Sequence, residues 1–242
     1  MNAIETHGLT KRYKKLTAVD GLELTVREGE LFALLGVNGA GKTTTIKMLS
    51  CLTRPTAGDA LLLGKSVVRE PEAVKRLIAV SPQETAVAPK LTVRENLELM
   101  AGIHGTDRAA IREKIDTLSA RFSLEEVLDR PAGKLSGGWQ RRLSIAMALI
   151  LEPRILFLDE PTLGLDVLAR AELWEQIRAL KGEITVILTT HYMEEAESLS
   201  DRIGVMSKGR LIRVGSVAEL TAETGAANLE AAFIALAKEG TK

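Results

Sequence analysis

Short apolar runs alternate with stretches of helical periodicity along this chain. Residues 31–35 and 155–158 are apolar at every position, and residues 184–188 are apolar at every position but one. Such runs are typical of strands that are covered on both faces of a sheet. Apolar positions at helical intervals follow two of these runs, at residues 43–49 and 168–177. The alternation of buried strands and helices predicts an α/β fold.

The two ends of the chain carry different patterns. Residues 2–26 hold short segments of alternating apolar and polar positions, most clearly at 22–26, with turn-forming residues between them. We expect an antiparallel sheet there, with Tyr13 in a loop between two strands. Near the other end, residues 203–214 read as two strands around a Ser-Lys-Gly turn and predict a hairpin, and residues 228–238 predict a helix.

The middle of the chain is helical in pattern. Thr92 and Glu95 have the spacing of a capping box, and apolar residues recur behind them at helical intervals. We therefore expect a helical insert within a single domain of residues 1–242. Its expected parts are an α/β core with a β subdomain (1–87 and 154–216), the all-helical insert (88–153) and a C-terminal helical tail (217–242).

A glycine-rich loop joins the first buried run to the helix that follows it. It reads Gly36-Val37-Asn38-Gly39-Ala40-Gly41-Lys42-Thr43-Thr44 and fits the GxxxxGK[ST] pattern without a mismatch. Glycines allow the backbone to approach a ligand closely, and the N–H groups at a helix N-terminus attract phosphate oxygens. Lys42 would add a positive charge at the phosphates, and the Thr43 hydroxyl would be a ligand for Mg²⁺. The loop predicts a nucleoside triphosphate site.

A second pair of glycines opens another helix, in Ser136-Gly137-Gly138. Ser136 is a favourable N-cap residue, and the glycines leave backbone donors uncovered. The segment predicts either a second anion site or an ordinary helix cap, and the residues alone do not decide between them.

Polar residues stand at the ends of two buried runs. Asp159 and Glu160 end the run at 155–158, where a carboxylate can hold Mg²⁺ and its neighbour can activate water. A solvated turn is the alternative, and the glycine loop upstream makes the catalytic interpretation the better one. His191 follows the run at 184–188, where a structural role remains open, and Tyr13 on its own reads as a surface residue in a basic stretch.

Composition narrows the function further. Lys plus Arg and Asp plus Glu both number 32, which gives a net charge of zero and no general attraction to nucleic acid. The single Cys51 excludes an intrachain disulfide. The longest apolar run, at 145–151, is far shorter than the roughly 18 residues of a membrane span. We expect a protein without a transmembrane segment that acts inside the cell.

The motifs, taken in order, resemble those of the ATP-binding subunits of ABC transporters, over essentially the whole chain. By this resemblance, residues 36–44 are similar to the Walker A loop, Gln83 to the Q-loop glutamine and residues 135–138 to the family signature. Residues 155–160 are similar to Walker B, 163–166 to the D-loop, His191 to the switch histidine, and Tyr13 to the aromatic residue that stacks on adenine. One departure is Trp139, which stands where the signature most often has Gln.

The resemblance implies a P-loop NTPase core of the RecA-like type and a set of functional residues. The implied catalytic residues are Glu160, His191, Lys42 and Gln83. The implied Mg²⁺ ligands are Thr43, Gln83 and Asp159. The implied contacts to ATP are Tyr13, Gly36, Asn38, Gly39, Ala40, Gly41, Lys42, Thr43 and Thr44 of one chain, with Ser136, Gly137, Gly138 and Asp166.

It also implies a function and partners. The chain would hydrolyse ATP with Mg²⁺ and power a transporter by head-to-tail dimerisation, with membrane permease subunits and a second ATP-binding subunit as partners and no nucleic acid. It would lie on the cytoplasmic side of the membrane. Residues 190–197 and 228–233 look most like the drug-export and ABC-2 type exporters. The alternatives are a nucleotide-binding module without hydrolysis and a soluble ABC ATPase with no transport role.

Overall fold

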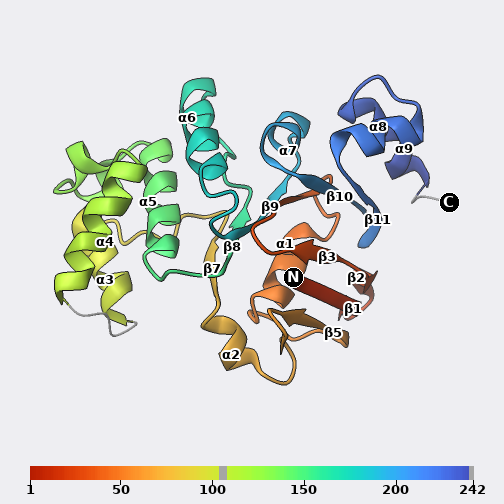
Figure 1. Ribbon diagram of the computed structural model, residues 1–242, viewed down its shortest axis with the longest axis horizontal. Coiled ribbons are helices and arrows are strands. Elements are labelled where there is room, and N and C mark those ends of the chain that lie inside the picture. The colour runs from red at the N-terminus through yellow and green to blue at the C-terminus, as the bar shows by residue number, and fades with distance from the viewer. Residues whose placement is uncertain (104–107, 240–242) are drawn as a thin grey trace.

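A six-stranded sheet lies at the centre of the protein (Figure 1). The computed structural model describes residues 1–103 and 108–239. The strand order is β11 (Arg210–Gly215), β10 (Arg202–Ser207), β4 (Leu31–Leu35), β9 (Thr185–Thr190), β8 (Ile155–Asp159) and β7 (Ile78–Ser81). Neighbouring strands are parallel except β10 and β11, which form the predicted hairpin.

Strand β4 shows why its sequence is apolar throughout. Leu31, Ala33 and Leu35 face one hydrophobic core, which is shared with the helical part of the chain. Phe32 and Leu34 face the opposite core, which is shared with the N-terminal strands and α1 (Lys42–Leu49). Because both faces of the strand are covered, no position of the strand can be polar without losing burial energy.

The N-terminal strands form the expected antiparallel sheet. Its order is β2 (Leu16–Leu22), β1 (Asn2–Tyr13), β5 (Ala57–Leu62) and β6 (Lys65–Ser66), and β3 (Thr25–Arg27) also pairs with β1. The short helix α2 (Pro71–Lys75) follows β6. The expectation that Tyr13 lies in a loop is wrong, because Tyr13 is the last residue of β1 and pairs with Leu16 of β2. The turn between these strands contains only residues 14 and 15.

Helices gather on one side of the central sheet, beyond β7 (Figure 1). They are α3 (Val93–Ile103), α4 (Arg108–Arg121) and α5 (Gly137–Leu149), with two short 3-10 turns at Glu125–Val127 and Ala132–Lys134. The predicted capping box is present at the start of α3. The backbone N–H of Glu95 donates to Thr92 Oγ1 at 3.2 Å, and that of Thr92 donates to Glu95 Oε2 at 2.7 Å.

Four further helices complete the described chain: α6 (Val167–Arg178), α7 (Met193–Leu199), α8 (Val217–Thr224) and α9 (Leu229–Glu239). Helices α8 and α9 pack against each other and on β10 and β11. A capping box of Ser216 and Glu219 opens α8, and Gly225 in the left-handed conformation ends it. The last three residues of the predicted tail, 240–242, lie outside the described residues.

Candidate functional site

The glycine loop lies between the end of β4 and the start of α1, and its shape requires glycine at two positions. A Cβ atom on Gly36 would lie 2.6 Å from the carbonyl oxygen of Met206. Gly41 has φ of +105°, and a Cβ there would lie 2.5 Å from Ala18 O. No side chain caps α1 and no acidic residue lies in its first turn. Its N-terminal N–H groups are therefore well placed to receive an anion.

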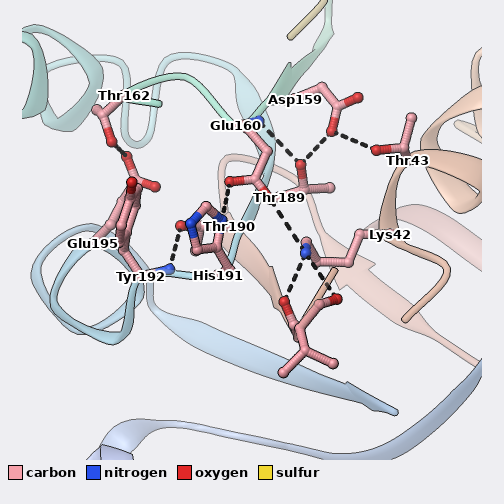
Figure 2. A network of polar contacts seen from close by, with 12 residues as sticks. Lys42, Thr43, Asp159, Glu160, Thr162, Thr189, Thr190, His191, Tyr192 and Glu195 are labelled. Atoms are coloured by element: carbon pink, nitrogen blue, oxygen red, sulfur yellow. Dashed lines mark hydrogen bonds and ion pairs between the residues drawn. The ribbon is translucent and has the colours of Figure 1, made fainter. Parts of the chain in front are cut away.

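Lys42 folds back over this loop. Its Nζ donates to Gly36 O at 2.7 Å and to Val37 O at 3.4 Å. The same ammonium forms an ion pair with Glu160 Oε1 at 3.2 Å, and both side chains are almost fully buried. The positive charge of Lys42 is thus held directly beside the loop (Figure 2).

Asp159 and Glu160 extend from the C-terminal end of β8, as the sequence predicts for parallel strands. Asp159 Oδ1 accepts hydrogen bonds from Thr43 Oγ1 at 3.1 Å and from Thr189 Oγ1 at 2.5 Å. Glu160 has φ of +50°, a conformation that is costly for a residue with a side chain. Its N–H donates to both the carbonyl and the hydroxyl oxygen of Thr189, at 3.1 Å each, and these bonds stabilise the bend.

The Glu160 carboxylate is shared between two residues of the predicted site. Its Oε2 lies 2.7 Å from His191 Nδ1, while Oε1 pairs with Lys42 (Figure 2). The His191 ring packs against Tyr192, with 4.1 Å between the ring centres. Strand order explains the meeting, because β8 and β9 are neighbours and both end at this edge of the sheet.

A cavity of about 700 Å³ opens over these groups, and we call it the first cavity. It contains most of the residues predicted to contact the nucleotide or its γ-phosphate. Its lining comprises Leu16, Thr17, Ala18, Asn38, Gly39, Ala40, Gly41, Lys42, Thr43, Thr44, Gln83, Glu160, Leu163, His191 and Lys208. The fifteen residues come from β2 of the N-terminal sheet, from the glycine loop and α1, and from segments that follow strands of the central sheet, so the cavity exists only in the folded chain.

Tyr13 is not among the residues that line the first cavity. Its side chain is 44% exposed, and Lys11 Nζ lies 5.1 Å from the ring centre. Leu16, its partner across the β1–β2 hairpin, lines the cavity instead. Stacking of Tyr13 on adenine stays a prediction.

The second glycine pair faces a different cavity, of about 830 Å³, which we call the second cavity. Ser136, Gly138, Trp139 and Asp166 are among its lining residues, and none of them lines the first cavity. Ser136 stands at the N-cap position of α5, but its hydroxyl makes no capping hydrogen bond. The hydroxyl and the uncovered N–H groups of Gly137 and Gly138 are therefore available to an anion.

Asp166 has a structural task as well as the predicted one. Its Oδ1 accepts from the backbone N–H of Ala169 at 2.9 Å and caps α6. Nearby, a Cβ on Gly138 would approach the Ala169 side chain to 3.2 Å, so a larger residue here requires Ala169 to shift by a few tenths of an ångström. The departure at Trp139 is accommodated by Arg142, whose guanidinium lies 4.9 Å from the ring centre and pairs with Glu172 of α6.

Sequence reasoning missed two residues that shape the first cavity. Thr189 binds both Asp159 and Glu160, and its place two residues before the predicted His191 is the one sequence signal that could have found it. Arg141 of α5 donates to Pro82 O at 2.7 Å and to Gln83 O at 2.5 Å, and so fixes the backbone beside Gln83. Burial lowers the pKa of the Arg141 guanidinium.

The oxygen atoms of three residues suit Mg²⁺: Thr43 and Gln83 line the first cavity, and Asp159 does not line it but contacts Thr43. The Thr43 hydroxyl and the Asp159 carboxylate lie 3.1 Å apart. Within the described chain there is no cluster of three or more His, Cys, Asp or Glu that could hold a metal. A site of few protein ligands fits Mg²⁺, which keeps several waters and binds substrate phosphates.

Comparison with known proteins identifies the family. The sequence profile described as "ABC transporter" matches residues 19–163. The chain belongs to the ABC transporter family. It is an ATP-binding subunit, as the motif order predicted, and the expected P-loop NTPase fold is confirmed. Cassettes of this family are ATPases that form dimers and work with permease subunits.

Two curated relatives cover most of this ABC cassette. A daunorubicin resistance ATP-binding protein of Streptomyces coeruleorubidus is 46% identical over 224 residues, which are 92% of this chain and 71% of that protein. The Nod factor export ATP-binding protein I of Ralstonia nicotianae is 44% identical over 218 residues, which are 90% of this chain and 68% of that protein.

Solved structures agree with the cassette fold. An ATP-binding subunit of an ABC transporter superimposes with a TM-score of 0.86 at 30% identity, covering 97% of this chain and 99% of its own. A dimeric cassette in a post-hydrolysis state, bound to ADP and Pi, superimposes with a TM-score of 0.79 at 26% identity, covering 88% and 98%. In the described part of this cassette, no helix has the length and apolar character to cross a bilayer.

Proposed function

We propose that this chain hydrolyses ATP to power a membrane exporter. The observation that carries the proposal is the Glu160 carboxylate, which lies between Lys42 and His191 in the first cavity. ATP phosphates would bind the N–H groups of residues 39–44 and the Lys42 ammonium. A water molecule would then attack the γ-phosphorus with its oxygen while Glu160 accepts a proton from that water. The bond between the γ-phosphorus and the bridging oxygen of the β-phosphate breaks in the same step.

His191 and the metal ligands would complete this site. His191 already bonds the Glu160 carboxylate, and so it would orient that base and contact the γ-phosphate. Thr43, Asp159 and Gln83 would hold Mg²⁺, which supplies charge neutralisation at the phosphates when it is bound. Tyr13 would stack on adenine from the end of β1.

The second cavity supports a head-to-tail dimer. Ser136 and Gly138 line a cavity separate from the glycine loop of the same chain, yet both segments present uncovered backbone donors. A nucleotide held by Lys42 of one chain would complete its shell of donors with Ser136, Gly137, Gly138 and Asp166 of a second chain. ATP would then hold two cassettes together, and hydrolysis would release them.

A groove beside Gln83 is our proposed contact with the permease. It has a volume of about 270 Å³ and is lined mainly by apolar side chains of β7, α3 and α5, with Pro82 and Ala86 from the loop between them. A short apolar helix of a membrane subunit would fit such a groove. The cassette would then sit on the cytoplasmic side of the membrane.

Export is proposed because the relatives named for drug resistance and Nod factor export are similar over about nine-tenths of this chain.

Complementation between two inactive variants tests this function. Lys42→Ala and Ser136→Arg would be co-expressed with different affinity tags, and the mixed dimer would be purified through both tags. Each variant alone should be inactive. The mixed dimer should recover about half of the wild-type phosphate release, because one of its two sites pairs an intact Lys42 with an intact Ser136. A mixed dimer that stays inactive would contradict the head-to-tail arrangement.

A further inference from the structure

Glu195 is the most deeply buried acidic residue near the site, and the mechanism above does not use it. It lies on α7, four residues after His191, and its relative exposure is 0%. Its Oε1 accepts hydrogen bonds from Thr162 Oγ1 at 2.8 Å and from Trp174 Nε1 at 3.2 Å. One carboxyl group thus joins three separate parts of the chain: the turn after β8, helix α6 and helix α7.

The second carboxyl oxygen of Glu195 lies where a negative charge is disfavoured. Oε2 is buried and is without a hydrogen-bond partner in the described structure. A buried carboxylate with an unpaired oxygen is much less favourable than a neutral carboxylic acid. Burial raises the pKa of Glu195, and hydrogen bonds from the side chains of Thr190, Thr162 and Trp174 oppose this rise without cancelling it. A neutral group can still accept both observed hydrogen bonds through Oε1.

Glu195 connects the two chain segments that carry the residues proposed for catalysis, Glu160 and His191. Thr162 lies two residues after Glu160, in a turn closed by the hydrogen bond from Leu163 N to Glu160 O at 3.2 Å. On the other side, α7 begins directly after His191 and Tyr192, and Ala196 N donates to Tyr192 O at 3.2 Å. The Glu195–Thr162 bond therefore spans the gap between the Glu160 turn and the His191 loop (Figure 2).

We propose that Glu195 is a positioning residue that holds His191 against Glu160. Its carboxyl group fixes the distance between the turn after β8 and the start of α7, and this distance sets the contact of His191 Nδ1 with Glu160 Oε2 at 2.7 Å. The inference rests on the proposed hydrolysis by Glu160. Trp174 of α6 also donates to Glu195, so a change at Glu195 removes a hydrogen bond between α6 and α7 as well.

Three variants and a control test this role in the purified cassette. Glu195→Leu removes the acceptor, Glu195→Gln keeps a neutral acceptor of the same length, and Thr162→Val removes the donor. Glu197→Leu changes an exposed residue of the same helix and is the control. For each, kcat and KM are measured by phosphate release, and the ATP dissociation constant is measured by calorimetry.

The expected result is a loss in kcat alone. Glu195→Leu and Thr162→Val should lower kcat by about 10- to 100-fold, since a small displacement of catalytic groups has effects of this size, while the ATP dissociation constant stays within about twofold. Glu195→Gln should keep most of the wild-type kcat, and Glu197→Leu all of it. If Glu195→Leu fails to fold, Thr162→Val still gives the comparison.

The two proposals fail in different ways. A wild-type protein with no phosphate release would overturn the proposed function. Wild-type turnover with an unchanged kcat in Thr162→Val and Glu195→Leu would overturn the role of Glu195 only. A kcat for Glu195→Gln as low as that for Glu195→Leu would also overturn it, because the neutral acceptor would then not be the working group.

Discussion

Replacing Glu160 by Gln tests the chemistry of the first cavity most directly. The change removes the negative charge that Lys42 and His191 share and keeps the shape of the side chain. It removes the proposed base, so phosphate release should fall. Without nucleotide, the Glu160 carboxylate forms an ion pair with the Lys42 ammonium and so competes with phosphate for it. Because the change removes this competitor, ATP binding should be kept or strengthened.

The size of each effect follows from the contacts. A positioned general base contributes about 10²- to 10⁴-fold, which corresponds to about 3–5 kcal/mol of activation free energy. Removing one partner of a buried ion pair costs about 3–5 kcal/mol of folding stability. The carbonyl oxygens of Gly36 and Val37 still bind Lys42 Nζ, so we expect the lower end. About 3 kcal/mol in a domain of this size lowers Tm by about 6–12 °C.

The assay combines turnover, binding and melting. Phosphate release gives kcat, calorimetry gives the ATP dissociation constant, and thermal melting with and without ATP gives the stabilisation by nucleotide. Glu72→Gln is the matched control, because Glu72 forms an exposed pair with Lys75 on α2, far from the cavity. A kcat of Glu160→Gln within about threefold of wild type would refute the role of Glu160, since a base contributes at least about 10²-fold.

Two further predictions concern single side chains. Tyr13→Ala should weaken ATP binding by about 1–3 kcal/mol if the ring stacks on adenine, as measured by calorimetry, and an unchanged affinity would leave Tyr13 as a surface residue. The raised pKa of Glu195 means that the folded chain holds more protons than the unfolded chain above pH 4.5, the ordinary value of this carboxyl. Its contribution to stability is therefore lost as pH rises from there through the raised pKa, and melting curves should show this loss in wild type and not in Glu195→Gln.

The sequence was sufficient for the parts of the site that depend on local pattern. The apolar runs located β4 and β8 because both faces of these strands are buried, which leaves no polar position to confuse the pattern. The glycine loop could be predicted because its residue spacing fits a phosphate-binding pattern, and the positive φ of Gly39 and Gly41 belongs to the loop's own backbone. Asp159 and Glu160 could be placed at the ligand-binding edge once β8 was recognised as a parallel strand.

The parts that were missed depend on contacts between distant residues. Arg141 binds Gln83 across 58 positions, and Thr189 binds Asp159 across 30. Neither contact follows from spacing, because each requires the order of the strands or the packing of α5 against β7. The residues alone left Ser136 open as a helix cap or as part of an anion site; its hydroxyl makes no capping hydrogen bond, which an average N-cap preference does not foretell.

The link from Arg141 to the loop after β7 has a mechanical consequence. Arg141 grips main-chain oxygens, so the coupling it provides does not depend on which side chains the loop carries. The same helix contributes Ser144, Met147 and Ala148 to the groove beside Pro82. If α5 slides or tilts, the loop after β7 moves with it through Arg141, and the groove beside Pro82 changes shape at the same time.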